Sequence, residues 1–252
     1  MSEKKYTNYL NDIPRFSLGL VFLWFGIDKF TIHEFYVSWL SSTERVSQIL
    51  PFDDISLSIY AIGIIELILA GFILSGLWIR PVSIIVVSFL VLTLVTAQYP
   101  SSYPQDIGLV GIAVFLVIAN ASWKRAQTEK FLEFLRIVRY SIAAVLFLWS
   151  IDQIMNFNRH VGWMDFSSPI SEFLPVGAIG PILIFVLVVE IILGILVSIG
   201  KIRVTKYSLI ALTTFLVFAV FFLEPPLKNH QSLGMAITTA WLAYIAFTKN
   251  KI

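Results

Sequence analysis

Residues 59–76 read IYAIGIIELILAGFILSG, an apolar run that carries one carboxylate, Glu66. Residues 183–200 read LIFVLVVEIILGILVSIG, and Glu190 stands at the same place in this second run. A helix needs about 17–25 predominantly apolar residues to cross the hydrocarbon core of a membrane. Both runs are therefore predicted to be membrane-spanning helices, each with an acidic residue in its middle.

The spacing of 124 residues between these runs extends along the chain. When residues 15–76 are placed on residues 139–200 without gaps, fifteen of the 62 positions are identical. Roughly five would be expected by chance for this composition. The shared polar and special residues are Arg15 and Arg139, Asp28 and Asp152, Trp39 and Trp163, Pro51 and Pro175, Glu66 and Glu190, and Gly76 and Gly200. The chain is predicted to be a tandem repeat, with residues 1–123 as the first unit and residues 139–252 as the second.

The composition places the chain in the membrane class. Of its 252 residues, 58% are hydrophobic and only 13% are charged, whereas soluble domains average roughly 45–50% and about 25%. A soluble domain of this size has no interior large enough for so much apolar surface. Disordered and nucleic-acid-binding proteins are excluded on the same grounds. The absence of cysteine excludes thiolate catalysis, disulfide exchange and cysteine-bound metal clusters.

Eight apolar segments are separated by charged or Pro- and Gly-containing stretches. They cover residues 16–32, 56–77, 82–99, 107–123, 140–156, 180–200, 207–223 and 232–247. We predict an all-α membrane protein with eight transmembrane helices, arranged as two tandem four-helix bundles. Because each unit has an even number of spans, the halves are expected to be related by a pseudo-two-fold axis along the membrane normal. Residues 124–138 are predicted to form a basic cytoplasmic linker helix.

The distribution of Lys and Arg predicts the orientation in the cell membrane. Fourteen of these residues fall on the side that holds both termini, and four fall on the other, namely Lys29, Arg45, Arg159 and Lys228. Cytoplasmic loops carry the excess of positive charge, so both termini are predicted to be cytoplasmic. The external segments 31–55 and 155–179 are predicted to be short helices at the membrane surface, or lids over an outward-facing cavity.

Ionisable residues within the spans are the candidate site. Asp28 lies 13 residues from Arg15, and Glu66 lies 14 residues from Arg80 on the returning helix. At the helical rise these separations are about 20 and 21 Å, so Asp28, Lys29 and Glu66 share one level in the outer half of the bilayer. Lys29 and Glu66 then form either a structural ion pair or a polar pocket that holds a quinone headgroup or passes protons.

Glu190 and Asp106 complete the set of candidate cofactor-binding residues, which is Asp28, Lys29, Glu66, Glu190 and Asp106. Gln153 replaces lysine opposite Glu190, and burial without a cation favours the neutral carboxyl. Asp106 is expected to cap the fourth span.

The remaining basic residues and histidines have simpler interpretations. Arg15 and Arg139, at cytoplasmic helix ends, are expected to extend to lipid headgroups. No metal site is predicted, because His33, His160 and His230 lie on separate connections without metal-ligand spacing.

Three segments carry a family resemblance. RFSLGLVFLWFGIDKF (residues 15–30), IGIIELILAGFILSGLWIRP (62–81) and PQDIGLVGIAV (104–114) resemble the first, second and fourth helices of the DoxX/DoxD-like membrane family. The first of these segments carries a G-x-x-K pattern at Gly26 and Lys29, and the third has an acidic start at Asp106. In the second half the G-x-x-K pattern becomes Ser150 and Gln153, and the acidic start becomes His230.

This resemblance implies one four-helix bundle per repeat and a redox context, because some relatives are the membrane subunit of a thiosulfate:quinone oxidoreductase. Others accompany redox or stress proteins. The function expected is a multi-pass membrane subunit of a redox-linked complex, with quinone as candidate cofactor and lipids and other complex subunits as partners. If the chain is enzymatic, it is a quinone-linked oxidoreductase subunit. The alternative is a stand-alone transporter or binding protein for a small molecule or lipid, with its site between the two halves.

Overall fold

The computed structural model of the chain describes residues 3–41, 50, 52–96, 103–122, 128–175, 177–200, 202–223 and 229–249, and this part holds no β-strand. Its helical elements, in chain order, are α1 (Glu3–Thr31), α2 (His33–Ser41), α4 (Ile55–Ser75), α5 (Ile79–Thr96), α6 (Tyr103–Ser122), α7 (Thr128–Met155), α8 (Phe157–Ser167), the 3₁₀ turn η2 (Pro169–Phe173), α9 (Ile179–Ile199), α10 (Ile202–Phe218), the π-helical segment η3 (Ala219–Leu223) and α11 (Asn229–Lys249).

The all-helical membrane architecture predicted from the sequence is confirmed in its broad form. Among the described residues, four helical segments are long and apolar enough to cross a membrane, namely Ile55–Ser75, Leu135–Met155, Ile179–Ile199 and Val204–Leu223. The segments Ile79–Leu94 and Asp106–Ile118 are apolar but shorter. The span in α9 has a mean hydropathy of 3.2, yet only 33% of it is buried inside the protein. An outward apolar face of this kind suits a membrane environment. The count of eight spans stays a prediction.

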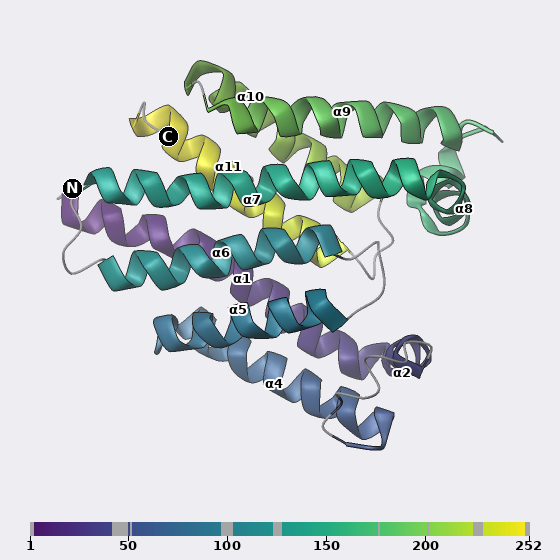
Figure 1. Cartoon of the computed structure of the whole chain (residues 1–252), viewed down its shortest axis with the longest axis horizontal. Coiled ribbons are helices and arrows are strands. Elements are labelled where there is room, and N and C mark those ends of the chain that lie inside the picture. The colour runs from purple at the N-terminus through teal and green to yellow at the C-terminus, as the bar shows by residue number, and fades with distance from the viewer. Residues whose placement is uncertain are drawn as a thin grey trace.

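The long helices run in one general direction, and the connections gather at the two ends (Figure 1). The short helices α2 and α8 lie at the same end of the molecule, and the N- and C-terminal ends lie at the opposite end. α2 and α8 contain much of the external segments predicted from the sequence. Their common location agrees with the predicted orientation of those segments relative to the termini.

The same helix pairs recur in the two halves. The helix α1 packs on α4 as α7 packs on α9, and α5 packs on α6 as α10 packs on α11. The last long helix of each half also packs on the first helix of the other half, α6 on α7 and α11 on α1. The two halves therefore share one helical body.

Small residues lie in both the α1–α11 and the α6–α7 contacts. The Ser17 hydroxyl on α1 donates a hydrogen bond of 2.6 Å to the carbonyl oxygen of Gly234 on α11. On the other side, a Cβ atom at Gly111 of α6 would collide with the side chain of Ser141 on α7. Glycine and serine allow helix backbones to approach closely in membranes. The position of Ser17 in the first half corresponds to that of Ser141 in the second.

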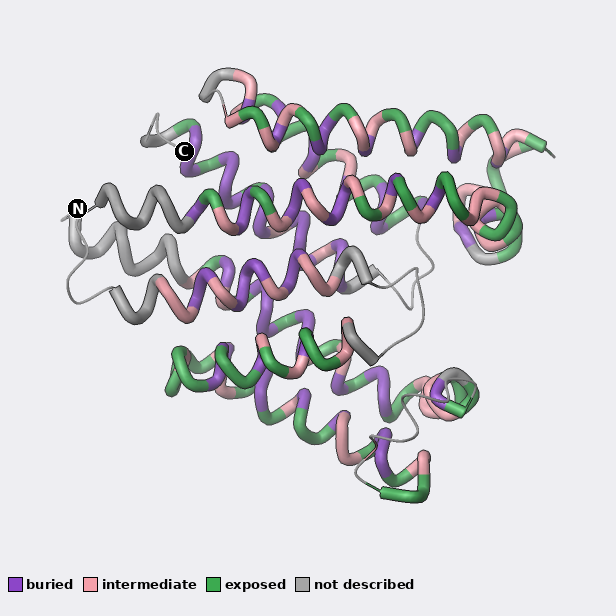
Figure 2. The backbone as a smooth tube through the Cα atoms, viewed as in Figure 1, coloured by how far each residue is buried: buried purple, intermediate pink, exposed green. Residues whose placement is uncertain are grey.

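Burial is highest where these helices meet. In Figure 2 the buried residues are concentrated along α1, α6, α7 and α11, whereas α4, α5, α9 and α10 carry more exposed positions. The main core includes Phe22, Phe115 and Trp241, all nearly inaccessible to solvent. The outer helices thus present apolar side chains to lipid, while the central helices bury theirs against one another.

Arg15 and Arg139 have a different role from the one expected. The Arg15 guanidinium donates hydrogen bonds to the carbonyl oxygens of Ile73 and Leu74, at 3.1 and 2.6 Å, in the last turn of α4. That helix ends at Gly76, which adopts the left-handed conformation with φ 75°. Arg139 is only 3% exposed. Neither side chain therefore extends to headgroups as expected: Arg15 binds the free carbonyls of a helix C-terminus, which attract a cation, and Arg139 is buried within the protein.

Arg139 lies at the corresponding helix end in the second half. Its guanidinium packs against Gly200, which follows α9 with φ 71°. A Cβ atom at Gly200 would lie 2.8 Å from Arg139 Nη1. The glycine therefore provides both the left-handed turn and the space for the arginine.

The predicted linker over residues 124–138 is not a separate helix in its described part. From Thr128 onward it continues without interruption into the fifth predicted span, as the single helix α7. Between Thr128 and Met155 there is neither glycine nor proline to end the helix, which is the physical reason for the continuity.

Candidate functional site

A buried ion pair joins α1 to α4 near the end of the molecule that holds α2. Lys29 Nζ lies 3.1 Å from Glu66 Oε2 and donates a hydrogen bond of 3.3 Å to Glu66 Oε1. Lys29 is 8% exposed and Glu66 is 3% exposed. The depth arithmetic on the sequence predicted this pairing. Both charges are removed from solvent, so each compensates the other.

Two glycines allow the helices to come together at this point. A Cβ atom at Gly63 of α4 would lie 2.8 Å from Lys29 Cβ. A Cβ atom at Gly26 of α1 would lie 2.6 Å from Leu67 Cγ and 3.0 Å from the Gly63 carbonyl oxygen. These contacts leave no room for larger side chains, and the resulting close approach brings Lys29 within reach of Glu66.

The Lys29 ammonium makes further contacts with a backbone carbonyl and two aromatic rings. It donates a further hydrogen bond of 3.3 Å to the carbonyl oxygen of Phe25. It also lies 4.3 Å from the ring centre of Tyr36 and 5.3 Å from that of Phe25. Aromatic faces attract cations at such distances. Tyr36 belongs to α2, so the short helix predicted at the membrane surface covers the ammonium.

Tyr36 adds a hydroxyl group to this region. Burial, reinforced by the negative charges of Asp28 and Glu66, raises the pKa of the Tyr36 phenol above its usual value. The phenol therefore keeps its proton at all physiological pH values and is available as a hydrogen-bond donor. Sequence reasoning did not select Tyr36. One feature of the sequence pointed to it: Tyr36 is an aromatic residue seven positions after Lys29, in a region that was expected to be helical.

His33 connects α2 to α4 beside the ion pair through hydrogen bonds and ring stacking. Its Nδ1 atom donates a hydrogen bond of 3.1 Å to the carbonyl oxygen of Lys29, and its Nε2 atom lies 2.7 Å from the Ser56 hydroxyl. The imidazole also stacks on Tyr60, with ring centres 4.0 Å apart. These contacts fix the position of α2 over the site.

Asp28, which is buried, and Asp106, which is half-buried, belong to the same region. Asp28 is 4% exposed, and its carboxyl receives a hydrogen bond from the Trp24 side chain. Asp106, in the first turn of α6, accepts a hydrogen bond of 3.1 Å from Gln231 Nε2 of α11. The Asp106 carboxyl interacts electrostatically with Lys29 and Glu66. It thus extends the polar region across the boundary between the halves, a role that capping alone does not describe.

Four of the five predicted site residues therefore meet in one place, and Gln231 joins them from the second half. We call Asp28, Lys29, Glu66, Asp106 and Gln231 the outer polar cluster. It contains one ammonium and three carboxyl groups. Because an interior of low dielectric cannot hold three negative charges against one positive charge at low cost, the cluster has the capacity to bind protons or a hydrogen-bonding ligand.

Glu190 does not join the outer polar cluster. It lies on α9, is 2% exposed, and accepts hydrogen bonds of 3.1 and 3.0 Å from Gln153 Nε2 and one of 3.4 Å from the Ser150 hydroxyl. Gln153 and Ser150 occupy the positions of Lys29 and Gly26 in the first half. The second half thus contains an equivalent buried carboxyl whose donors are an amide and a hydroxyl.

The two histidines whose side chains are described, His33 and His160, are engaged with protein groups. His160 Nε2 lies 2.8 Å from Asp152 Oδ2, and Asn156 donates a hydrogen bond of 2.7 Å to Asp152 Oδ1. His33 and His160 are held in different halves, and the side chain of His230 lies outside the described residues. Where side chains are described, no three of them form a group suited to a metal ion.

Fold and site together define a class of protein, an all-helical membrane protein with an acid–base cluster buried among its helices. Comparison with known families makes the class specific. The DoxX family model matches residues 11–99, which confirms the resemblance noted in the sequence for this part of the chain. The matched region contains Asp28, Lys29 and Glu66 and ends before Asp106. Neither the curated proteins nor the solved structures contain a significant match.

Proposed function

We propose that this DoxX-like protein is a membrane subunit of a redox-linked complex and that its outer polar cluster binds the polar ring of a quinone. The observation that carries the proposal is the ion pair of Lys29 and Glu66, 3.1 Å long and buried within apolar helices. Charged residues at such depth are costly and usually mark a functional site. The DoxX match covers this pair, so the residues that suggest the function lie in the part of the chain with a known family.

The chemistry of the outer polar cluster suits a quinone. Quinone carbonyl oxygens accept hydrogen bonds, and the Lys29 ammonium and the Tyr36 hydroxyl are donors. Reduction of a quinone to a quinol consumes two electrons and two protons. The carboxyl groups of Glu66 and Asp106 can relay protons to the two oxygens. The electrons are assigned to a partner subunit, because the chain has no cysteine to hold a thiolate-bound redox centre.

The proposed membrane arrangement places this cluster in the outer half of the bilayer. Eight spans form two four-helix repeats about a pseudo-two-fold axis, and both termini face the cytoplasm across the cell membrane. The excess of Lys and Arg on the terminal side supports this orientation. The common location of α2 and α8 opposite the two termini (Figure 1) supports placing the external segments and the termini on different sides.

Lys29→Gln is the sharpest test of the quinone site. The variant reproduces in the first half the Gln153–Glu190 arrangement that the second half already accommodates. We expect the affinity for a short-chain benzoquinone to fall by roughly 10–100-fold, equivalent to the about 1.5–3 kcal/mol that a charge-assisted hydrogen bond contributes. The measurement is calorimetric titration of the protein in lipid nanodiscs.

Glu190→Gln provides the control on the other half. Glu190 corresponds to Glu66, the partner of Lys29, and it lies outside the outer polar cluster. We expect it to leave quinone affinity unchanged. Thermal unfolding of both variants shows whether they remain folded. The quinone proposal is wrong if Glu190→Gln weakens binding while Lys29→Gln does not, or if the wild-type protein binds no quinone.

The role as a complex subunit has a separate test. After extraction from native membranes with a mild detergent, we expect the protein to copurify with larger redox subunits in stoichiometric amounts, identified by mass spectrometry. Such subunits would also cover part of the apolar surface described above. A protein that purifies alone and carries no quinone would contradict the proposal and leave a transporter or lipid-binding protein as the better hypothesis.

A further inference from the structure

The first helix of each half carries an arginine that lies against the end of the next long helix of that half, and the two guanidinium groups are placed alike. A Cβ atom added at Gly76 would lie 2.8 Å from Arg15 Nη1, and one added at Gly200 would lie 2.8 Å from Arg139 Nη1. Each guanidinium also lies over the aromatic ring of the residue that follows it, at 4.6 and 4.7 Å from Cζ to the ring centre. The partners of the two arginines can therefore be compared atom by atom.

In the first half this guanidinium has an anionic partner. Arg15 donates hydrogen bonds from Nε and Nη2 to Asp12 Oδ1, at 3.2 and 2.9 Å. Asp12 lies one helical turn before the arginine, and its side chain is 39% exposed. The carboxylate thus approaches the guanidinium from the surface of the protein and compensates its charge.

No carboxylate stands at the corresponding place in the second half. The position equivalent to Asp12 is Arg136, whose side chain is exposed. The Nε atom of Arg139, equivalent to the Nε atom of Arg15 that donates to Asp12, is buried without a hydrogen-bond partner. Arg139 is only 3% exposed, and among the described residues it belongs to none of the ion pairs. Two arginines one turn apart therefore replace an arginine and an aspartate.

This arrangement favours an anion that the chain does not itself supply. A buried guanidinium without a negative partner is costly, and like charges three or four residues apart on a helix repel each other. A negative group at the place of the Asp12 carboxylate would accept a hydrogen bond from Arg139 Nε and reduce the repulsion from Arg136. Phosphate suits this place, because its oxygen atoms match the fork of a guanidinium and its charge is sufficient for two of them.

The start of α10 adds to the attraction for an anion. The helix begins at Ile202, two positions after the glycine that contacts the Arg139 guanidinium. Helix N-termini attract anions through their free amide groups and their dipole. In the first turn, Thr205 is completely buried and its hydroxyl oxygen has no hydrogen-bond partner. The sequence of residues 200–206, GKIRVTK, contains three basic residues and no acidic one.

The position of this region relative to the membrane also suits a phosphate. The turn between α9 and α10 lies at the end of the molecule that holds the chain termini (Figure 1), which is predicted to be cytoplasmic. The candidate span in α9 ends at Ile199, so the turn follows directly on the hydrocarbon core. The phosphates of lipid headgroups lie at this level, and phosphates dissolved in the cytoplasm reach it as well.

We infer that Arg139 and Arg136 form a binding site for a phosphate group at the end of the second half where α10 begins. The phosphate takes the place that the Asp12 carboxylate holds in the first half, so the inference assigns one such site to the chain. Arg139 stays folded against the turn after α9, and the phosphate comes to it. The site lies at the opposite end of the helices from the outer polar cluster and is independent of the quinone proposal.

The experiment tests the full-length protein in detergent micelles with two phosphate sources. Native mass spectrometry counts the phosphatidylglycerol molecules that remain bound. Thermal unfolding is followed with added phosphatidylglycerol, and with inorganic phosphate against chloride at equal ionic strength. For the wild-type protein we expect one tightly bound phosphate ligand and a higher unfolding temperature in its presence.

Arg136→Asp reproduces the pairing of the first half, so that a carboxylate of the chain itself occupies the place of the phosphate. We expect the affinity for the phosphate ligand to fall by roughly 10–100-fold, as for the loss of a charge-assisted hydrogen bond. Without ligand, the unfolding temperature of this variant should equal or exceed that of the wild-type protein. Arg80→Asp is the matched control, because it makes the same change of charge at another exposed arginine, and it should leave the affinity nearly unchanged.

The outcomes identify the source of the phosphate or reject the site. Stabilisation by phosphatidylglycerol alone identifies a lipid headgroup, and stabilisation by inorganic phosphate identifies a dissolved phosphate. The inference is overturned if neither ligand binds, or if Arg80→Asp weakens binding as much as Arg136→Asp, since overall charge then explains the binding. If Arg136→Asp does not fold, Arg136→Gln replaces it and must weaken binding, or the site is rejected.

Discussion

Lys29→Met is expected to lower the free energy of unfolding by about 3–5 kcal/mol, the usual cost of removing one partner of a buried ion pair. The Glu66 carboxyl, 3% exposed, would lose the ammonium that lies 3.1 Å away and gain a thioether that donates no hydrogen bond. The measurement is the unfolding of the purified protein in mixed micelles with increasing denaturing detergent.

Two further variants show whether the lost charge is the cause. Lys29→Gln should cost less than Lys29→Met, because an amide at this position can donate to Glu66 as Gln153 donates to Glu190. The double variant with Lys29→Met and Glu66→Met should recover most of the stability, since no charge is then left buried. If the double variant is no more stable than Lys29→Met, side-chain packing rather than charge pairing stabilises this contact.

Gly111→Ala is expected to be the most damaging change of its size at the boundary between the halves. A Cβ atom at this position would collide with the side chain of Ser141, whose Cβ atom is attached directly to the α7 backbone and has little freedom to move. We expect a loss of about 1–3 kcal/mol in the free energy of unfolding, the typical cost of overpacking a tight core contact. The same detergent titration measures it.

Two controls accompany this prediction. Adding Ser141→Gly to Gly111→Ala should restore part of the lost stability, because the colliding side chain is removed. Gly71→Ala changes a glycine on α4 that has no atom within 4 Å of the added carbon, and it should raise stability by up to about 1 kcal/mol through helix propensity. Equal effects of Gly111→Ala and Gly71→Ala would show that the contact between α6 and α7 is not close-packed.

Some features of the site were accessible from the sequence because they depend on position along single helices. The apolar runs around Glu66 and Glu190 predicted helices in a membrane, and the rise per residue placed Lys29 level with Glu66. The structure shows this pair in contact. The family resemblance came from the same residues, because glycine, lysine and glutamate are conspicuous in apolar segments.

Other features depend on which helix faces which, and periodicity does not contain this information. Asp106 was expected to serve its own helix, yet its partner is Gln231, 125 residues away on α11. Arg15 was expected to reach lipid, yet it caps α4 through the carbonyls of Ile73 and Leu74. In both cases a neighbouring helix supplies a group that binds more closely than water or lipid.

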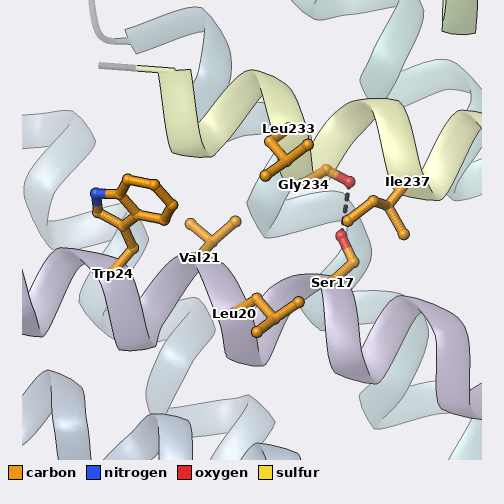
Figure 3. Close-up of a pocket in the computed structure, with 7 residues that line it drawn as sticks. All are labelled: Ser17, Leu20, Val21, Trp24, Leu233, Gly234 and Ile237. Carbon is orange, nitrogen blue, oxygen red and sulfur yellow. Dashed lines mark hydrogen bonds between the residues drawn. The ribbon is translucent and has the colours of Figure 1, made fainter. Parts of the chain in front are cut away.

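The sequence by itself determined that the chain is an apolar, all-helical membrane protein that resembles the DoxX family over residues 11–99, with a carboxyl at matching positions in its two halves. Composition and helical rise suffice for this, because both are properties of the chain before it packs. Only the tertiary structure decided that Asp106 and Gln231 join Lys29 and Glu66. This arrangement arises because small residues such as Ser17, Gly111 and Gly234 let helices of opposite halves approach closely, as Figure 3 shows for Ser17 and Gly234. A contact between residues more than 100 positions apart in the sequence is a property of the packed chain alone.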